Sequence, residues 1–584
     1  MKKIFVSILS AAVLCFAVSC ENLDLFPESE AALSENEVFS SYEGYHGFFL
    51  KCYLAMVCET QGSGHGGDDL AKWDAGRSTF LRAMYWSQEA TSDEMYNRSG
   101  SGYGLRNATA LNWEPGTEFP SWLYYRSYLI ISYANELLRR TEENVLKENG
   151  VYEACRNEVG YWRAEARFIR AYMYYILMDS FGDIGFVDNT VPNGTYPVQK
   201  TRKEIYDYIV KELEDIQDDL VPAGQKIWGR ANQASAWFLL ARTLLGCHVY
   251  AGTMTDYGKA LEYCRKIITS GAFSLAPNYI ENFLADNDTS NEIIWGLACD
   301  SNRAIGSGGT NYLIKANLHA PMIAGGTGLD FGITDQWGGN HCLRQTFVEK
   351  FEESDRDFHY DDSWGDRKKD HRALLFMGPE TEGKIDGKNA ALVKELYADA
   401  DPTNTTVGNS APYGSLYTKW RNVRKDRVVR DPSNYSSVGF PVMRLADVYL
   451  MAAEAIMRAN GGSPDAEALG YVNEVRERAY CSGKYYQADK CNADGAITLG
   501  ELTYAWLLDE RSRELWSENW RRSDLVRFNC YTKNYSWDFK GYMPNDKGIS
   551  YYGIKDVNDK YNVFPIPQDD VRYNPNLRQN PAYE

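Results

Sequence analysis

Small and apolar residues recur at helical spacing in separate parts of the chain, and this pattern limits the folds that the sequence can adopt. In one segment, residues that follow one another in steps of four and three form a continuous stripe: Ala164, Phe168, Ala171, Tyr175 and Met178. That spacing places all of them on one face of a helix. Alanines on such a face let neighbouring helix axes approach closely. The stripe therefore predicts a packed helix that ends at Gly182.

The same spacing returns further along the chain. Residues 234–248 repeat it, and residues 445–459 and 468–479 form two helical segments joined by a turn rich in glycine. Paired helices of this length favour tetratricopeptide-like units, although no strict repeat of 34 residues is visible. We expect a mainly α fold, with a helical scaffold over about residues 41–275 and 440–530.

The segment between these helical blocks has a different composition. Residues 276–439 are rich in Gly, Asn, Asp and Trp, which is typical of long irregular loops with a few short strands. Residues 60–120 share this character. Long loops on a rigid scaffold commonly carry a binding surface. We therefore interpret residues 276–439 as a loop-rich insertion on the ligand side of a single domain that spans residues 41–584.

The first residues predict export. Lys2 and Lys3 precede an apolar stretch over residues 4–18, which fits a signal peptide and is shorter than the roughly 20 residues of a membrane-spanning helix. The small residues that end it are followed by Cys20, as in the lipobox of bacterial lipoproteins. We expect a signal peptide over residues 1–19, an acylated Cys20 and a tether over residues 20–40. An ordinary secretory cleavage site is the alternative.

Cysteine spacing gives no metal site. The chain has 12 cysteines and no CxxC pair, so a zinc site is not expected. Cys481 and Cys491 flank a loop and could form a disulfide. A calcium loop centred on Gly495 would place Lys490 at its first ligand position, so a solvated turn is the better interpretation. We predict no metal and no cofactor.

Composition narrows the classes of partner. Apolar residues make up 44% of the chain and charged residues 24%, which excludes a disordered chain and a polytopic membrane protein. The net charge of -18 repels nucleic acid and anionic membrane surfaces. Only the lipid is therefore expected to hold the protein to a membrane. Aromatic residues are abundant, with 15 Trp and 42 Tyr.

Ordered segments over more than 500 residues resemble the SusD/RagB family of surface lipoproteins. They are residues 23–27, 91–94, 164–172 with 181–183, 444–450 with 453–455, 510–515 with 524–525, 564–567, 574–577 and 579–581. The resemblance implies a SusD-like helical fold and a non-catalytic role. It also implies a place at the outer membrane beside a SusC-like TonB-dependent β-barrel transporter, where the protein captures oligosaccharide for import.

The aromatic residues in polar, glycine-rich loops are the candidate ligand contacts. A sugar presents an apolar face that stacks on Trp or Tyr, while Asp, Asn and Arg hydrogen-bond its hydroxyls. The candidate aromatics are Trp73, Tyr96, Trp113, Trp337 and Trp364. The candidate hydroxyl partners are Asp68, Asn97, Arg98 and Asn340. Because the ligand loops of the family vary, none of these residues is assigned by the resemblance.

Two other functions stay open at this point. A surface glycoside hydrolase with a helical fold needs two carboxylates at a defined separation, and 80 acidic residues leave room for such a pair. A helical-repeat adaptor that binds protein or peptide is the other alternative. The motifs HExxH, GxSxG and GxxxxGK[ST] are absent from the sequence. We therefore favour a glycan-binding protein with no catalytic residue.

Overall fold

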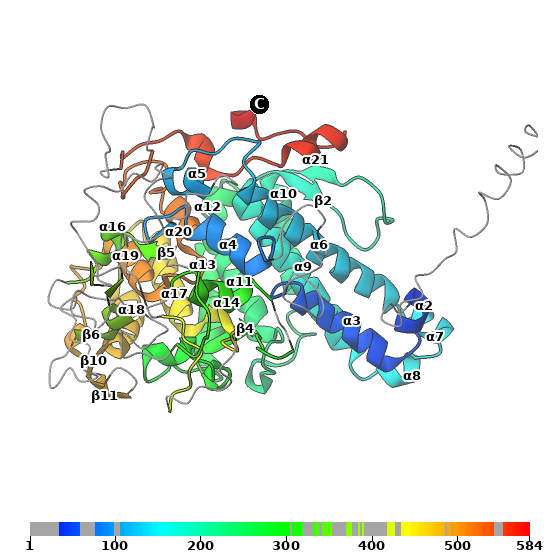
Figure 1. The fold of residues 1–584 in the computed structure, drawn as a ribbon, viewed down its shortest axis with the longest axis horizontal. Coiled ribbons are helices and arrows are strands. Elements are labelled where there is room, and N and C mark those ends of the chain that lie inside the picture. The colour runs from blue at the N-terminus through cyan, green and yellow to red at the C-terminus, as the bar shows by residue number, and fades with distance from the viewer. Residues whose placement is uncertain are drawn as a thin grey trace, which may run out of the picture.

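The structure is a computed structural model with helices as its main element (Figure 1). It describes residues 34–58, 70, 76–97, 105–303, 306–318, 331–337, 341–352, 369–375, 384–385, 388–389, 417, 419–426, 434–484, 487–491, 493–541 and 553–584. The predicted signal peptide and Cys20 lie outside these residues. Among the described helices, none has the length and apolar character needed to cross a membrane.

Helices occupy most of the N-terminal half. They are α2 (Glu35–Val38), α3 (Tyr42–Leu54), α4 (Phe80–Gln88), α5 (Leu105–Ala110), α6 (Phe119–Arg140), α7 (Glu143–Glu148), α8 (Tyr152–Cys155), α9 (Val159–Phe181), α10 (Arg202–Ile216), α11 (Gln233–Leu245), α12 (Cys247–Tyr250) and α13 (Tyr257–Thr269). The later helices are α14 (Gly309–Lys315), α16 (Gln345–Val348), α17 (Leu445–Ala459), α18 (Ala466–Ala479), α19 (Tyr504–Leu515), α20 (Arg521–Arg527) and α21 (Gln568–Tyr573). Short 3-10 helices lie at Ala223–Gln225, Tyr279–Phe283, Asn287–Thr289, His371–Leu375, Ala493–Gly495, Asp559–Asn562 and Pro581–Tyr583.

The described strands are short and pair in antiparallel fashion. The pairs are β1 (Met95–Asn97) with β5 (His341–Leu343), β2 (Ile184–Phe186) with β3 (Val198–Lys200), β4 (Ile293–Leu297) with β9 (Phe440–Arg444), and β7 (Lys384–Ile385) with β8 (Lys388–Asn389). A further sheet has the order β11 (Gln487–Cys491), β10 (Tyr480–Lys484), β6 (Lys369–Asp370). The prediction of a mainly α protein with a few short strands is confirmed.

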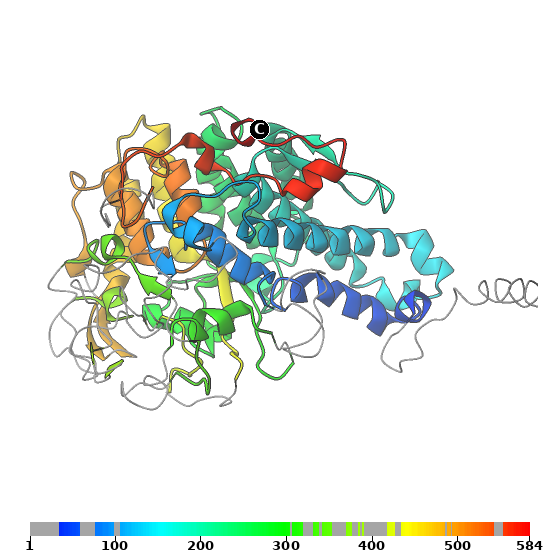
Figure 2. The same cartoon turned by 45° about the horizontal axis from the view of Figure 1, so that its top comes forward.

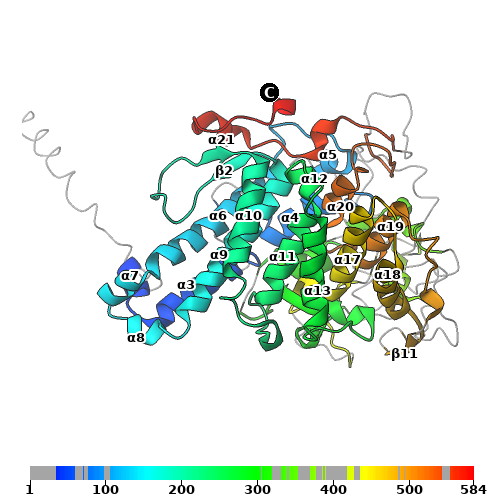
Figure 3. The ribbon, with the colours of Figure 1, turned by 180° about the vertical axis from the view of Figure 1, so that it is seen from behind.

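Successive helices pack side by side to form the scaffold. Helix α9 packs between α6 and α10, α11 packs between α10 and α13, and α17 packs between α13 and α18. Figure 3 shows α10, α11, α13, α17 and α18 as a row of neighbouring helices. The row is continuous although more than 170 residues separate the end of α13 from the start of α17 in the sequence. The two helical blocks that the sequence predicts therefore form one body.

Local sequence explains where these helices begin and end. Every residue from Phe168 to Phe181 on α9 is buried, so the apolar stripe lies at the centre of the scaffold. Gly182 ends α9 with a φ of 77°, a left-handed conformation that favours glycine. A capping box, in which Thr201 accepts from the backbone of Glu204, begins α10.

The C-terminal tail packs back over the N-terminal helices, as Figure 2 shows. The backbone N–H of Phe564 donates to the carbonyl of Ser180 at 2.7 Å, and the Asn580 amide donates to the carbonyl of Phe181 at 2.8 Å. These contacts satisfy carbonyls at the last turn of α9, where intrahelical partners run out. Figure 2 also shows α3 and α6 lying alongside each other.

Ion pairs between helices are a feature of the scaffold. Several of these pairs involve charged residues of the segment 164–172, which carries part of the family resemblance. Arg167 donates to Glu212 in a bidentate pair at 3.0 and 2.8 Å, which joins α9 to α10. Glu165 is buried on α9 and accepts from Arg230 and from the hydroxyl of Tyr53.

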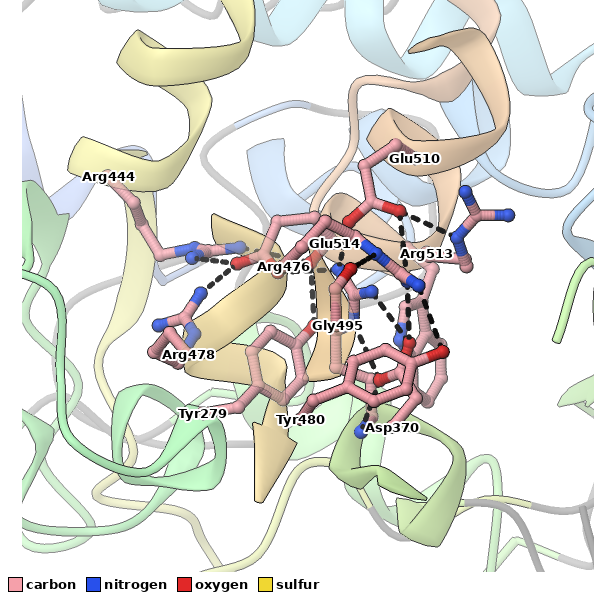
Figure 4. Close-up of polar contacts among 12 residues, drawn as sticks. Tyr279, Asp370, Arg444, Arg476, Arg478, Tyr480, Gly495, Glu510, Arg513 and Glu514 are labelled. Atoms are coloured by element: carbon pink, nitrogen blue, oxygen red, sulfur yellow. Dashed lines mark hydrogen bonds and ion pairs between the residues drawn. The ribbon is translucent and has the colours of Figure 1, made fainter. Parts of the chain in front are cut away.

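A larger ion-pair network fastens part of the loop-rich insertion to α19. We call Asp370, Arg372, Arg444, Glu510 and Glu514 the Arg372 network. The buried Arg372 guanidinium lies 2.7 Å from Asp370, 2.8 Å from Glu510 and 3.0 Å from Glu514. Glu514 also pairs with Arg444 at the end of β9, at 2.9 Å. Figure 4 shows Glu514 turned toward Arg444 and Glu510 turned toward Arg513. The network therefore ties residues 369–375 to α19 and β9.

Candidate ligand-binding site

Trp337 lies within a cluster of aromatic and charged side chains at the edge of the loop-rich insertion. We call Arg82, Tyr312, Lys315, Asp335, Trp337 and Tyr435 the Trp337 cluster. The Trp337 ring is half-buried, and its centroid lies 6.0 Å from that of Tyr312 at an interplanar angle of 50°. Tyr435 is half-buried as well. The cluster therefore combines partly exposed aromatic rings with polar groups.

Two cations lie over these rings. The Arg82 guanidinium lies 4.2 Å from the centroid of the Tyr312 ring and 6.0 Å from that of Trp337. The Lys315 ammonium lies 5.4 Å from the Trp337 centroid and 5.5 Å from that of Tyr435. Cations in these positions are attracted by the negative faces of the rings. They also place hydrogen-bond donors beside the aromatic surface.

Four separate segments assemble the cluster: α4, α14, residues 331–337 and the segment that carries Tyr435. Tyr312 and Lys315 are three residues apart on α14, so they share a helix face, and Arg82 comes from α4. The backbone N–H of Trp337 donates to the carbonyl of Lys315 at 2.9 Å, which fixes residues 331–337 against the end of α14. A Cβ atom at Gly308 would lie 1.9 Å from the hydroxyl oxygen of Thr79. Glycine there therefore permits α14 to approach α4.

Asp335 supplies the carboxylate of the cluster. It lies 3.2 Å from the Lys315 ammonium, and its side chain is 47% exposed, whereas that of Lys315 is 5% exposed. Burial works against ionisation of Asp335, but hydrogen bonds from the Gln336 backbone and from Lys315 hold its pKa below the usual value. Asp335 is therefore ionised at neutral pH and available to solvent as an acceptor.

The buried His341 contacts Tyr312 of the cluster. The His341 ring stacks on Tyr85 with centroids 4.1 Å apart, and its Nε2 lies 2.9 Å from the Tyr312 hydroxyl. Burial, and secondly the nearby Arg82, lower the pKa of His341 well below the usual value. A neutral imidazole therefore holds the Tyr312 hydroxyl in place.

The structure brings the backbone of two further candidates to the same place. Strand β1 pairs with β5, so Tyr96 lies opposite Cys342 and Asn97 lies opposite His341. The side chains of Tyr96 and Asn97 are outside the described part. Five other candidates also lie outside the described residues: Asp68, Trp73, Arg98, Asn340 and Trp364.

The prediction of Trp113 as a ligand contact is wrong. Its side chain is fully buried, its indole N–H donates to the Tyr583 hydroxyl at 2.9 Å, and its ring packs against Phe564 with centroids 4.9 Å apart. Residues of the C-terminal tail therefore cover Trp113 and the loop around it. Trp113 therefore contributes to packing between the tail and the N-terminal helices.

Arg82, Tyr312, Lys315, Asp335 and Tyr435 were not among the candidates from sequence. One available signal was the glycine-rich run at residues 306–309, which is followed at once by a short helix that carries an aromatic and a basic residue three positions apart. That pattern indicates the helix α14, but it does not indicate which other segments pack against this helix. The meeting of α4, α14 and residues 331–337 depends on tertiary packing.

Two pockets lie elsewhere in the described part of the chain. One, of about 190 Å³, is lined by apolar residues of α3 such as Leu50 and Leu54, and by Trp228. The other, of about 320 Å³, lies between Glu118 and Tyr125 on one side and the start of α21 on the other. Neither is lined by the Trp337 cluster. The cluster is thus a candidate site distinct from these two pockets.

Buried carboxylates close to α4 do not form a hydrolase site. Glu89 and Glu94 are buried, and Glu94 accepts from the Ser512 hydroxyl at 2.7 Å while Glu89 accepts from the Asn519 backbone at 2.6 Å. Burial raises the pKa of both carboxyls. Because both are fully enclosed, they have no route to a glycosidic bond. Among the described residues, no group of three or more His, Cys, Asp or Glu is arranged to hold a metal ion.

The chain matches two family models. The model described as the SusD family covers residues 241–583, and the model described as starch-binding associating with outer membrane covers residues 75–245. The starch-binding protein SusD of Bacteroides thetaiotaomicron is 31% identical over 100% of this chain and 99% of that protein. A SusD-like protein of Bacteroides ovatus is 22% identical over 78% of this chain and 80% of that protein.

Solved structures agree with the fold. A SusD homologue from Bacteroides thetaiotaomicron superposes with a TM-score of 0.66 at 19% identity, covering 95% of this chain and all of that one. The surface glycan-binding protein A of the same species, in complex with laminarihexaose, superposes with a TM-score of 0.63 at 18% identity, covering 92% and 99%. By its family match and its full-length relative, this chain belongs to the SusD family of non-catalytic glycan-binding proteins.

Proposed function

We propose that this protein captures an oligosaccharide at the cell surface on the Trp337 cluster and passes it to a TonB-dependent β-barrel transporter, while an acylated Cys20 holds the protein to the outer membrane. The observation that carries the glycan site is the half-buried Trp337 ring with Lys315 and Asp335 beside it. A ring face stacks on the C–H face of a sugar, and the charged groups hydrogen-bond the hydroxyls. Both kinds of contact are available here.

A single stack is too weak to capture a ligand alone. Each stack contributes on the order of 1 kcal/mol, whereas micromolar affinity needs about 8 kcal/mol. Trp337 and Tyr435 therefore need hydrogen bonds from the charged residues and further contacts. An extended glycan supplies repeated sugar units along the surface, so several weak contacts add up on one ligand.

The relatives favour a glucan as the ligand. The full-length relative at 31% identity is named as a starch-binding protein, and one structural neighbour is described in complex with laminarihexaose, a glucose oligomer. We therefore propose a neutral glucose polymer, with α-linked starch fragments first. The net charge of -18 also disfavours polyanionic glycans.

Native affinity electrophoresis tests the glycan site. The chain from residue 21, made without its lipid, is run through gels that contain amylopectin, laminarin or a mannan. We expect retardation in one of the glucan gels and its loss in Trp337→Ala. Tyr573→Ala is the matched control, because Tyr573 is 62% exposed and lies on α21, away from the cluster. Equal retardation of both variants would show that glycan binds elsewhere.

Two further assays separate the alternatives. A surface glycoside hydrolase would release new reducing ends from the retained glycan, and we expect none. A protein-binding or peptide-binding adaptor would show no glycan retardation, and Trp337→Ala would leave its binding unchanged. Either result would move the function away from glycan capture.

The anchor and the transporter need their own experiments. Cells fed a labelled fatty acid should incorporate label into the wild-type protein and not into Cys20→Ala. Purification of the anchored protein from outer membranes in mild detergent should recover a large β-barrel protein. Absence of any such partner under every growth substrate would count against delivery to a transporter while leaving glycan binding intact.

A further inference from the structure

The hairpin of β10 and β11 brings two cysteines opposite each other. In the antiparallel ladder the Cα partner of Cys481 is Cys491, and the next pair is Ser482 with Lys490. Directly opposed residues of such a ladder have Cα atoms about 4.5 or 5.5 Å apart and Cβ atoms on the same face. Both separations lie within the range of about 4.4 to 6.8 Å that a disulfide spans. The backbone register therefore meets the requirement for a cross-strand disulfide.

The opposed positions of Cys481 and Cys491 distinguish them from the cysteines that carry free thiols. Free thiols are found at Cys52, Cys155, Cys247, Cys264, Cys299 and Cys530. Burial raises the pKa of the Cys52 thiol to about 12, so that thiol is protonated and slow to react. By contrast, Cys481 and Cys491 are register partners separated by a short hairpin, so closure of their ring needs no movement of distant segments.

We propose that Cys481 and Cys491 form an intramolecular disulfide that closes the β10–β11 hairpin. The two thiols lose two protons and two electrons, and one S–S bond forms. A protein disulfide of the thiol oxidase class accepts the electrons and is reduced to a dithiol. The family is associated with the outer membrane, and proteins on their way there pass through an oxidising compartment.

The position of this disulfide gives it a structural role. Strand β10 also pairs with β6, where Tyr480 is the partner of Asp370 and Cys481 is the partner of Lys369. Asp370 belongs to the Arg372 network, and Arg476 donates to the Tyr480 hydroxyl at 2.9 Å. A closed hairpin holds β10 in register with β6. The disulfide therefore secures the strand by which the loop-rich insertion reaches the ion pairs around α19.

Peptide mapping tests the bond directly. The full-length protein is exported by its host, treated with an alkylating agent during lysis and digested with trypsin without reductant. Lys484 and Lys490 lie between the two cysteines, so trypsin places Cys481 in the peptide 479–484 and Cys491 in the peptide 491–511. We expect these two peptides to travel as one linked species, lighter by about 2 Da than the sum of the free thiol forms.

Variants complete the test. In Cys481→Ser, we expect the linked species to disappear and Cys491 to be alkylated. In the control Cys530→Ser, the linked species should persist, because Cys530 carries a free thiol far from the hairpin in sequence. We also expect faster hydrogen exchange of β10 amides in Cys481→Ser and in the reduced wild type. Separate alkylated peptides from the unreduced wild type, or a link to another cysteine, would overturn the proposal.

Discussion

The Trp337 cluster and the Arg372 network both bring carboxylates and cations together, but only the Trp337 cluster leaves such groups exposed. Arg372, Glu510 and Glu514 are each 0% exposed, and Arg372 pairs with the two glutamates at 2.8 and 3.0 Å. Trp337 is half-buried, and Asp335 keeps half of its surface in solvent. A dense group of charges alone therefore does not indicate a candidate binding site in this fold. The Trp337 cluster is a candidate because a ligand can still reach its exposed groups.

The largest effect should come from breaking the Arg372 network. Arg372→Ala leaves three buried carboxylates, Asp370, Glu510 and Glu514, without this cation. Removal of one partner from a buried ion pair costs about 3–5 kcal/mol because the remaining charge stays buried. Urea unfolding should show this loss in the free energy of unfolding.

The matched control for that experiment is an exposed pair between two scaffold helices. Arg265 and Glu467 join α13 to α18 at 2.6 Å, with side chains 45% and 39% exposed. Arg265→Ala should cost no more than about 1 kcal/mol. Equal losses in the two variants would show that the Arg372 network is no more important than a surface pair.

The next effect contrasts two neighbouring buried carboxyls. Burial opposes ionisation of Asp93, but Arg521 and Lys350 outweigh it and hold its pKa below the usual value. The contribution of ionised Asp93 to the free energy of unfolding is therefore present above the pKa that Asp93 has in the unfolded chain, about 3.9. This contribution is lost as the pH falls toward the lower pKa of the folded state. Asp93→Asn should cost about 3 kcal/mol at pH 7 because Arg521 and Lys350 lose their counter-charge.

Glu94 should behave in the opposite way. Burial, followed by the charge of Glu89, raises the pKa of Glu94 well above its usual value. Its contribution is fully present below the unfolded pKa of about 4.3 and is lost as pH rises through the folded pKa. Glu94→Gln keeps the neutral form, so its stability relative to wild type should rise between pH 5 and 8 by about 1 kcal/mol or more. Urea unfolding measured at several pH values in that range tests this. The prediction is wrong if the free energy of unfolding of Glu94→Gln falls with pH as that of the wild type does.

A substitution in the Trp337 cluster should lower the affinity for glucan and leave the stability of the fold unchanged. Trp337→Ala removes one partly exposed ring, so affinity for a bound glucan should fall about 5- to 10-fold, equivalent to on the order of 1 kcal/mol. Isothermal titration calorimetry measures this change, and circular dichroism should show unchanged thermal unfolding within a few degrees. A large drop in the unfolding temperature with unchanged affinity would make Trp337 a packing residue, as Trp113 is.

Local patterns predicted the scaffold because helix burial leaves its period in the sequence. The stripe from Ala164 to Met178 lies on α9, and Gly182 ends that helix as expected. Trp113 was misassigned because its surroundings, Asn112 to Gly116, have the composition of an exposed loop. Tyr583 lies 470 residues away and covers it, which no local pattern reveals. The neighbours of Trp337 in the cluster were not identified from sequence for the same reason, since α4, α14 and Trp337 meet only in the folded chain.

The smallest effect should come from Asp335, at the exposed edge of the Trp337 cluster. Asp335→Asn removes the charge that holds the Lys315 ammonium at 3.2 Å, so Lys315 should spend less time over the Trp337 ring. Because Asp335 is half exposed, the free energy of unfolding should change by less than about 1 kcal/mol. Glucan affinity should fall about 2-fold at low salt, and the difference should shrink at high salt as the pair is screened. Asp207→Asn, which breaks an exposed pair with Lys203 on α10, should leave affinity unchanged at both salt concentrations. If Asp335→Asn had no effect at low salt while Trp337→Ala did, the ring alone would bind the sugar and the charged edge would serve only to position α14.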